Sequence, residues 1–292
     1  MARCIYVNGS YHDYQAASVH AEDRGFQFGD AVYEVMEVKS GQIIDESRHL
    51  QRLERSLGEL EMAQPMSHAA LRLVIRETVR RNRVADGMVY LQVSRGSGPR
   101  DFLFSGVQTG PTTVCLARSV EPSTQAAAAE KGIKVITCPE MRWARCDIKT
   151  VMLLPASLAK QSAKQAGAQE AWFVDADGYV LEGGSSNAWI LTTDNEIVTR
   201  PVDDAILRGV TRTTLVDLLA QQGLSFSQRA FTRDDVLNAR EAFITSATNL
   251  VMPVIEVDGH PIGDGVPGDV VKLLRRTFHE VAEASDLERQ PR

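Results

Sequence analysis

One lysine stands where its charge would be costly to keep. In the segment RCDIKT, residues 145–150, Lys149 follows an acid and leads into the apolar run Val151–Leu154. Burying a bare ammonium is strongly unfavourable, so such a side chain either extends its head to water or loses its charge. Loss of charge would make it a reactive amine. Position alone favours the solvated lysine, and other residues must decide.

Two further segments carry polar groups where strands or helices are expected to end. In YVLEGGSSNAWIL, Glu182 directly follows an apolar run, and a carboxylate there suits a cationic ring nitrogen. In AILRGVTRTTL, a glycine precedes Val210 and Thr211 at an apparent helix start, where free N–H groups and a hydroxyl suit a phosphate. Taken singly, the first pattern is typical of a turn and the second of a simple helix cap.

The three features share one chemistry. An amine that forms a Schiff base, a carboxylate for a pyridine nitrogen and a helix N-terminus for a phosphate are the groups that pyridoxal 5′-phosphate requires. The sequence therefore predicts this cofactor.

Composition argues against several other classes. The formal net charge is −6, and the densest basic patch, residues 80–83, lies at the polar end of an expected helix, so no nucleic-acid partner is expected. No stretch approaches the roughly 18 apolar residues of a membrane span, and the N-terminus lacks an apolar signal core. The expected location is cytoplasmic, with no membrane partner.

The cysteines and histidines point to no further site. The four cysteines show no CxxC spacing or disulfide framework, and the six histidines form no metal-ligand pattern. No GxSxG elbow appears. We expect reduced thiols and no metal.

The elements that must position these residues follow from periodicity. Asn-Gly in CIYVNGSYH and Ser-Gly in AVYEVMEVKSGQIID predict hairpins, and leucines at three- and four-residue steps after residue 47 predict an amphipathic helix, with a second over 67–83. A hairpin on Asp-Gly near 177 and helices around 155–166, 209–222 and 269–285 follow.

The expected fold class is α+β in two domains. Residues 1–120 form a small domain of strands with segregated helices, and the polar stretch 121–127 is the expected linker. Residues 128–292 form a larger, mixed β domain with peripheral helices that binds the cofactor.

The chain also resembles class IV, fold-type IV aminotransferases that use pyridoxal phosphate, and most of all the D-amino-acid aminotransferases. This resemblance implies a small N-terminal domain and a larger, β-barrel-like C-terminal domain. Matching segments occur in order along nearly the whole chain: EDRGFQFGDAVYEV (22–35), HLQRL (49–53), VYLQVSRGSGPR (89–100), RWARCDIKT (142–150), LEGGSSN (181–187), ILRGVTR (206–212) and FITSAT (243–248).

The resemblance implies roles for matched residues. Lys149 is then the Schiff-base lysine and general acid/base, and Glu182 pairs with the protonated pyridine nitrogen. Arg52 holds the phosphate, and Tyr33 lies near the lysine. The remaining cofactor-binding residues are Leu207 on the ring face, the amides of Val210 and Thr211, the turn residues Ser185, Ser186 and Asn187, and Ser246 with Ala247, whose backbone meets the phosphate.

The substrate-binding segment departs from the family pattern. The best-known D-amino-acid aminotransferases carry an Arg-x-His pair here, whereas this chain reads Arg100, Asp101, Phe102. Arg100 with Tyr90 and Tyr33 is expected to hold a substrate carboxylate. Phe102 removes a donor and adds apolar surface, and Asp101 is positioned in sequence to compete for Arg100. A second departure, Ala247 in place of a hydroxyl residue, is expected to weaken phosphate binding modestly.

The expected reaction is transamination of a D-amino acid such as D-alanine with 2-oxoglutarate, yielding a 2-oxo acid and D-glutamate. Phe102 keeps open an (R)-selective amine transaminase, which retention of Arg100 opposes. A branched-chain aminotransferase fits less well, because EGGSSN lacks the pattern of that branch. A 4-amino-4-deoxychorismate lyase and an inactive cofactor carrier also stay open. The resemblance further implies a homodimer.

Overall fold

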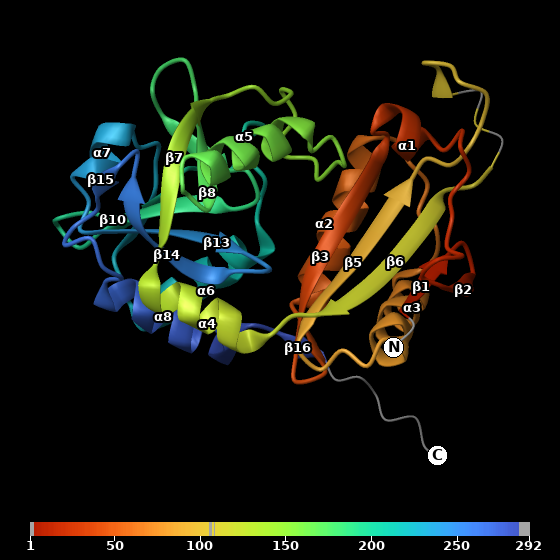
Figure 1. Ribbon diagram of the computed structural model, residues 1–292, viewed down its shortest axis with the longest axis horizontal. Coiled ribbons are helices and arrows are strands. Elements are labelled where there is room, and N and C mark those ends of the chain that lie inside the picture. Colours follow the sequence, from red (N-terminus) through yellow and green to blue (C-terminus); the bar gives the residue numbers. More distant parts are fainter. Residues whose placement is uncertain (1–2, 105–106, 108, 286–292) are drawn as a thin grey trace. The chain divides into compact units, whose positions relative to one another are not determined.

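The computed structural model describes residues 3–104, 107 and 109–285, which divide into two compact units (Figure 1). Unit 1 contains the described residues up to Pro122, the segment Ile148–Met152 and residues 283–285, whereas unit 2 contains Ser123–Asp147 and Leu153–Ala282. Lys149 thus belongs to unit 1 although the chain on both sides of its segment belongs to unit 2. Residues 121–127, the expected linker, lie largely in helix α4 (Pro122–Lys131).

Unit 1 is built on an antiparallel sheet that contains both expected hairpins. Asn8 and Gly9 have φ angles of 45° and 95°, the paired left-handed conformation of a tight hairpin turn. Ser40 and Gly41 connect the next hairpin in the same way, with φ angles of 50° and 78°. The strand order is β16 (Ala284–Ser285), β4 (Gln42–Ile44), β3 (Ala31–Lys39), β5 (Gly87–Ser94), β6 (Thr112–Ser119), β1 (Cys4–Val7) and β2 (Ser10–Asp13).

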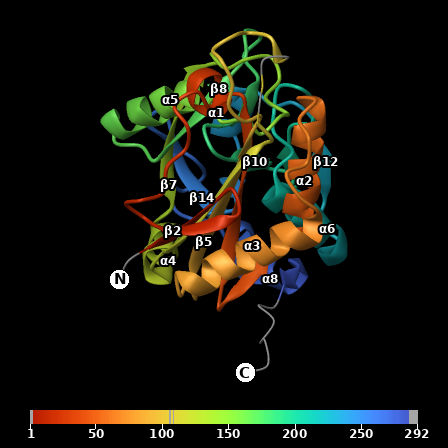
Figure 2. The same cartoon turned by 90° about the vertical axis from the view of Figure 1, so that its right-hand side faces the viewer.

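Two amphipathic helices cover one face of this sheet, as the leucine spacing predicted. Helix α2 (Glu46–Glu59) packs on β3 and buries Leu50, Leu53 and Leu57. Helix α3 (His68–Arg81) begins at the cap Ser67, whose side chain accepts from the amide of Ala70, and packs against β1, β5 and β6 (Figure 2). A short helix, α1 (Arg24–Phe28), precedes β3.

Strand β3 presents different chemistry on its two faces. Val32, Glu34 and Met36 alternate along the strand and are completely buried, on the face that α2 covers. Tyr33 lies on the opposite face, because successive side chains of a strand point to opposite sides. A tyrosine and a glutamate that are adjacent in sequence are thereby separated by the sheet.

Unit 2 is a mixed sheet in which six strands close into a barrel. The ring closes because β10 pairs with both β13 and β9. Its strands are β7 (Ile133–Pro139), β8 (Glu170–Val174), β9 (Val180–Gly183), β10 (Asn187–Leu191), β13 (Glu241–Ser246) and β14 (Leu250–Val257), and three short strands extend it: β11 (Ile197–Thr199), β12 (Phe226–Gln228) and β15 (His260–Pro261).

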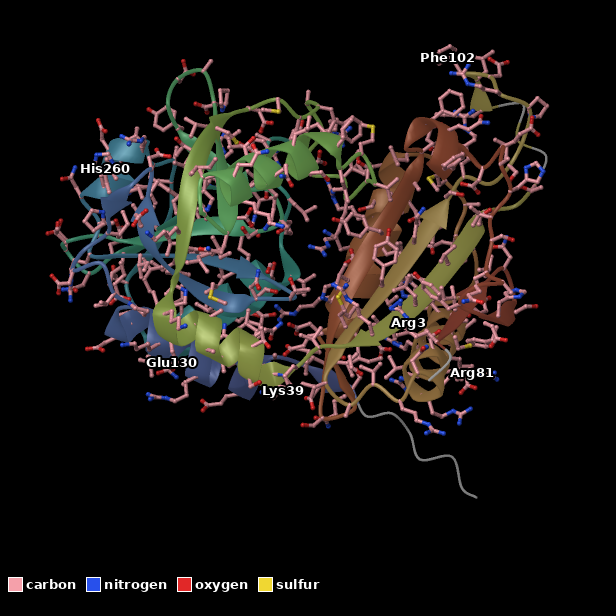
Figure 3. All side chains as sticks on the ribbon, in the orientation of Figure 1. Arg3, Lys39, Arg81, Phe102, Glu130 and His260 are labelled. Atoms are coloured by element: carbon pink, nitrogen blue, oxygen red, sulfur yellow. The ribbon has the colours of Figure 1, made fainter. Side chains whose placement is uncertain are left out.

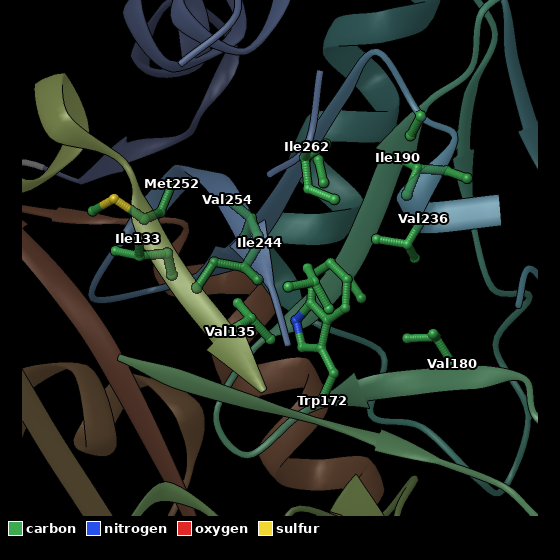
Figure 4. Packing of buried hydrophobic residues seen from close by; sticks show 14 of the residues in the cluster. Ile133, Val135, Trp172, Val180, Ile190, Val236, Ile244, Met252, Val254 and Ile262 are labelled. Carbon is green, nitrogen blue, oxygen red and sulfur yellow. The ribbon is translucent and has the colours of Figure 1, made fainter. Parts of the chain in front are cut away.

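The largest side chain of the barrel core is Trp172, which packs in a cluster with side chains from the other five strands of the ring (Figure 4). Val135, Ile190, Ile244 and Val254 are among these neighbours, each at most 3% exposed. The core is therefore filled, and polar functional groups have to lie at strand ends and turns.

Helices lie outside the ring. They are α5 (Leu154–Gln165), α6 (Val210–Gln222), α7 (Arg233–Leu237) and α8 (Asp269–Val281), in addition to α4. The expectation of a helix over 269–285 was wrong at its end. Ala282 has extended backbone angles (φ −66°, ψ 137°), and Ala284 and Ser285 instead pair with Ile44 and Ile43 of β4.

Candidate functional site

Lys149 lies in a loop segment that joins strand β3 of unit 1 through one isolated bridge, between Val32 and Thr150. The amide of Tyr33 donates to the carbonyl of Lys149 at 3.0 Å, and the amide of Val151 donates to the carbonyl of Ala31 at 3.0 Å. The Nζ atom lies 4.2 Å from the centroid of the Tyr33 ring. Within the described residues no carboxylate pairs with this amine, so the only contact described for it is with the aromatic face.

Tyr33 and Tyr90 form the surface beside the lysine. Their rings stack with centroids 5.5 Å apart, and the Tyr90 hydroxyl donates to Oε1 of Gln92 at 2.7 Å. Burial, with a smaller contribution from Tyr33, raises the pKa of Tyr90 to about 12. Tyr90 is therefore a neutral phenol at physiological pH, and the structure brings together three residues that the sequence had assigned to one site.

Arg52 is held by a buried acid on the helix-covered face of β3. Its Nε and Nη2 atoms donate to Oε1 and Oε2 of Glu34 at 2.8 and 2.6 Å, and Nδ1 of His49 lies 2.7 Å from Oε2. Burial by itself would raise the pKa of Glu34, but the charge and hydrogen bonds of Arg52, together with His49, lower it to about 2. Burial also lowers the pKa of His49, which therefore donates as a neutral ring. The assignment of Arg52 to the phosphate stays a prediction.

Arg100 and Phe102 lie on an exposed loop of unit 1. The guanidinium carbon of Arg100 is 5.2 Å from the centroid of Phe28, and Phe102 is 78% exposed. The carboxylate of Asp101 accepts from the amide of Leu103 at 3.3 Å and forms no ion pair with Arg100. Among the described residues, no hydrogen bond, ion pair or ring contact joins this loop to Tyr33, Tyr90 or Lys149.

Glu182 occupies the end of β9 in unit 2, next to a bulge. The pairing of β8 with β9 shifts between Trp172–Gly183 and Val174–Val180, so β9 contains one additional residue there. A bulge re-aims the side chains beside it. Glu182 is 5% exposed, and its carboxylate accepts from Nη1 of Arg142 at 2.5 Å, from Asn187 at 3.0 Å and from the Leu207 amide at 3.1 Å.

Arg142 is a functional candidate that sequence reasoning missed. Besides Glu182, its guanidinium binds Glu140 through Nε and Nη2, and it lies 4.4 Å from the Phe173 ring centroid. Burial opposes its charge, but the hydrogen bond to Glu140 and the charge of Glu182 outweigh burial and raise its pKa. The Arg142 guanidinium therefore fixes the direction of the Glu182 carboxylate. The residue lies inside the matched segment RWARCDIKT, but its partner is 40 positions away.

Helix α6 begins at Val210, where the sequence predicted a helix start. Gly209 is the N-cap and makes no side-chain cap, so the first amides of the helix, from Val210 and Thr211, have no cap acceptor. A Cβ at Gly209 would collide with Oδ1 of Asn187, so only glycine allows this approach. Asn187 also donates to the carbonyl of Leu207 at 2.9 Å, which ties Leu207 to the Glu182 group.

Ser246 and Ala247 lie next to the strand position that pairs with Asn187. In the sheet, Asn187 is paired with Glu182 on one side and with Thr245 on the other. Ser246 ends β13, its hydroxyl accepts from the amide of Asn249 at 3.1 Å, and Ala247 begins the following turn. The structure therefore places the carboxylate, the asparagine and the β13–β14 turn along one row of unit 2.

Ser185 and Ser186 are engaged with a buried acid that the sequence had not indicated. Their hydroxyls donate to Oε2 of Glu170 at 3.2 and 3.0 Å, and Nζ of Lys160 lies 3.3 Å from Oε1. Glu170 is 1% exposed. The serine side chains therefore hold the β9–β10 turn together.

These donor groups match the parts of pyridoxal phosphate. A buried carboxylate beside a bulge suits a ring N–H⁺, uncapped helix amides behind an obligatory glycine suit a phosphate, and an amine without an acid partner in the described chain suits an aldehyde. The described residues contain no group of three or more acidic, histidine or cysteine side chains placed to hold a metal. None of the helices in the described ranges combines the length and apolar composition of a membrane span.

Comparison with known proteins identifies the family. Residues 31–257 match the family described as amino-transferase class IV. A D-alanine aminotransferase of Bacillus licheniformis is 39% identical over 271 residues, covering 93% of this chain and 94% of that protein. A D-alanine aminotransferase of Staphylococcus haemolyticus is 33% identical over 280 residues, covering 96% and 98%.

Solved structures confirm the expected fold. A branched-chain amino acid aminotransferase from T.th., solved with pyridoxamine 5′-phosphate, has a TM-score of 0.86 at 26% identity and covers 96% of this chain and 94% of its own. The Escherichia coli branched-chain aminotransferase has a TM-score of 0.88 at 21% identity, covering 99% and 100%, which shows the shared fold. This chain therefore belongs to the class IV aminotransferases and is an enzyme that depends on pyridoxal 5′-phosphate.

Proposed function

We infer that this enzyme transfers the amino group of D-amino acids, such as D-alanine, to 2-oxo acids such as 2-oxoglutarate. The observation that carries this inference is the match, over more than nine-tenths of the chain, to two proteins named D-alanine aminotransferase. The class IV fold is shared with branched-chain enzymes, so the fold alone does not select the substrate.

Lys149 is the residue that binds the cofactor and moves the proton. When bound, pyridoxal phosphate supplies an electron sink for the charge that develops at the substrate Cα. The ε-amine of Lys149 lies over the Tyr33 ring and pairs with no carboxylate of the described residues, so it is placed to bind the cofactor aldehyde and to take up the Cα proton. The Tyr33 ring beside it restricts where the amine can move.

Glu182 and the α6 amides hold the two ends of the cofactor. Glu182, held in place by Arg142, would pair with the ring nitrogen, and the amides of Val210 and Thr211 would bind the phosphate. Leu207 would pack on the ring, and the backbones of Ser246 and Ala247, with Arg52, would complete the phosphate contacts. Ser185, Ser186 and Asn187 shape the turn that aims Glu182.

Arg100, Tyr90 and Tyr33 are proposed to bind the substrate carboxylate. The raised pKa of Tyr90 keeps its hydroxyl as a donor. Phe102 supports a second candidate, an (R)-selective amine transaminase, because an exposed aromatic side chain replaces a polar donor on the same loop. Arg100 opposes that candidate, since an amine without a carboxylate gives the guanidinium nothing to bind.

We also propose a cytoplasmic homodimer. The four cysteines, Cys4, Cys115, Cys138 and Cys146, are all free thiols, which suits a reducing compartment. The dimer is what the family resemblance implies, and sedimentation velocity of the holoenzyme measures it directly.

The half-reaction separates these candidates. Purified holoenzyme is mixed separately with D-alanine, L-alanine and (R)-1-phenylethylamine, and the absorbance of the cofactor is followed as it changes to its amine form. Conversion by D-alanine alone supports the proposed function, and conversion by the amine alone replaces it with the second candidate. Pyruvate released from 4-amino-4-deoxychorismate without any amino acceptor identifies a lyase. Lys149→Ala is the control that must abolish conversion.

A further inference from the structure

One buried arginine fastens the loop that carries Arg100. The guanidinium of Arg24 donates from Nη1 to the carbonyl of Asp101 at 2.6 Å and from Nη2 to the carbonyl of Phe102 at 3.4 Å. Arg24 is only 5% exposed. Because a guanidinium is planar and presents several donors at once, one side chain fixes two successive peptide units. Those units directly follow Arg100 in the chain.

Arg24 is itself held in place. Its Nε donates to Oδ2 of Asp30 at 2.8 Å, and its backbone amide donates to the carbonyl of Gly96 at 2.9 Å. Asp30 also accepts from Nε and Nη2 of Arg95 at 2.8 and 3.1 Å. A carboxylate shared by two buried guanidiniums leaves Arg24 little rotational freedom, so the loop is attached to a rigid base.

An aromatic ring connects Arg24 to Arg100. The centroid of Phe28 lies 4.5 Å from the guanidinium carbon of Arg24 and 5.2 Å from that of Arg100. Phe102, at the tip of the loop in Figure 3, meets Phe28 edge to face with centroids 5.8 Å apart. Within the described residues Arg100 forms no hydrogen bond or ion pair, so its donors stay available while the ring supports its position.

We propose that Arg24 is a positioning residue for substrate selection, holding the loop so that the Arg100 guanidinium is presented to a substrate carboxylate. Arg24 does not touch the substrate and acts through the carbonyls of Asp101 and Phe102. This inference deepens the proposed function and rests on it, since it takes Arg100 as the carboxylate-binding residue. With Phe102 in place of a donor, orientation of the single guanidinium becomes more important for affinity.

Arg24→Lys tests the role, because an ammonium keeps the charge and can reach Asp30 but lacks the planar fork. The KM for D-alanine should rise about tenfold, as expected when hydrogen bonds from a charged donor are lost, with kcat nearly unchanged. The cofactor content of the dialysed protein, which does not depend on a substrate carboxylate, should stay as in wild type. Amide hydrogen exchange of residues 100–104 in the holoenzyme should become at least about tenfold faster.

Two further variants keep the test decisive. Arg76→Lys is the matched control, because Arg76 also pairs with a buried acid of unit 1, Glu46 at 3.0 Å, but has no described contact with the loop; it should leave the KM for D-alanine unchanged. Phe28→Leu removes the ring between the two guanidiniums without removing a buried charge. It should reproduce the KM effect even where Arg24→Lys folds poorly.

The outcomes separate this role from the proposed function. Unchanged exchange of residues 100–104, or an unchanged KM for D-alanine in both Arg24→Lys and Phe28→Leu, overturns the positioning role. If wild type fails to convert D-alanine, the proposed substrate class is refuted. If Arg24→Lys then still speeds amide exchange of residues 100–104, the role of Arg24 in holding the loop is retained.

Discussion

Each unit contains a buried glutamate bound by an arginine, and the two pairs differ in their setting. Glu34 lies within β3, is completely buried, and is bound by Arg52 and His49, both from helix α2. Glu182 lies at the end of β9 beside a bulge and is bound by Arg142 and by groups from separate segments of the chain.

The difference shows how a buried acid becomes structural or functional. The partners of Glu34 come from one helix packed on its strand, so this pair fastens α2 to the sheet. The partners of Glu182 come from two loops and the start of a strand, so they fix its direction more than they join two elements. A strand end next to a bulge is also where a ligand can approach.

Glu34→Ala should have the largest effect, and it should be on stability. Removing the acid breaks the buried hydrogen bonds that Glu34 accepts from Arg52 and His49, and breaking such a buried pair costs about 3–5 kcal/mol of unfolding free energy. Urea denaturation followed by circular dichroism measures this loss. Glu77→Ala, which removes a surface acid paired with Arg80 and Arg81, is the control and should cost less than about 1 kcal/mol. A stable Glu34→Ala enzyme that has lost activity would remove the contrast between the two glutamates.

Glu182→Gln should instead have a large effect on turnover and a small effect on stability. Turnover should fall about 10²–10³-fold, as expected when one preorganised charge is removed from a reacting centre, while cofactor is retained. Stability should change little, because Glu140 still binds Arg142. Single-turnover kinetics with D-alanine and the cofactor content of the dialysed protein measure the two quantities. If Glu182→Gln unfolds as readily as Glu34→Ala, Glu182 is a scaffold residue.

The dependence of the unfolding free energy on acidic pH should measure the contribution of Glu34 alone. A carboxyl whose pKa falls from 4.5 to about 2 on folding contributes on the order of 3 kcal/mol at neutral pH. The folded pKa is the lower one, so this contribution is complete above pH 4.5 and is lost as the pH falls toward 2. Compared with wild type, Glu34→Gln should show a flatter dependence of unfolding free energy on pH across this window. Equal slopes would mean that Glu34 does not titrate in this window.

The sequence predicted a helix or turn correctly where the pattern that indicates it lies entirely within that element. Leucine spacing predicted α2 because its apolar face is complete by itself, and Asn8-Gly9 predicted a hairpin because the turn geometry is local. Helix α4 was not expected because it buries only Ala129 and shows no apolar periodicity, although its alanine run favours a helix. The end of α8 was misjudged because β16 forms by pairing with a distant strand.

Prediction of the candidate site was limited in the same way, because distant partners leave no local pattern. Resemblance in the matched segments predicted Lys149 and Glu182, but the partners that aim such groups lie far away in sequence. Arg142 is 40 residues from Glu182, and Arg24 is 77 residues from Asp101. Both arginines were inside matched segments, but no local pattern indicates which acid or carbonyl an arginine will bind.

Ser185→Ala should have the smallest effect on stability. It tests a third buried acid, Glu170, whose partners include side chains of the turn next to Glu182. Glu170 is bound by the hydroxyls of Ser185 and Ser186, by Lys160 and by the amide of Ala171, so loss of one hydroxyl leaves it three partners. Unfolding free energy should fall by about 1 kcal/mol or less, and cofactor affinity should stay as in wild type. Glu170→Ala is the comparison, because it removes the acceptor of both serines and should loosen the turn next to Glu182. If Ser185→Ala instead releases the cofactor while Glu170→Ala does not, the serine hydroxyl contacts the cofactor directly, and the turn is part of the binding surface.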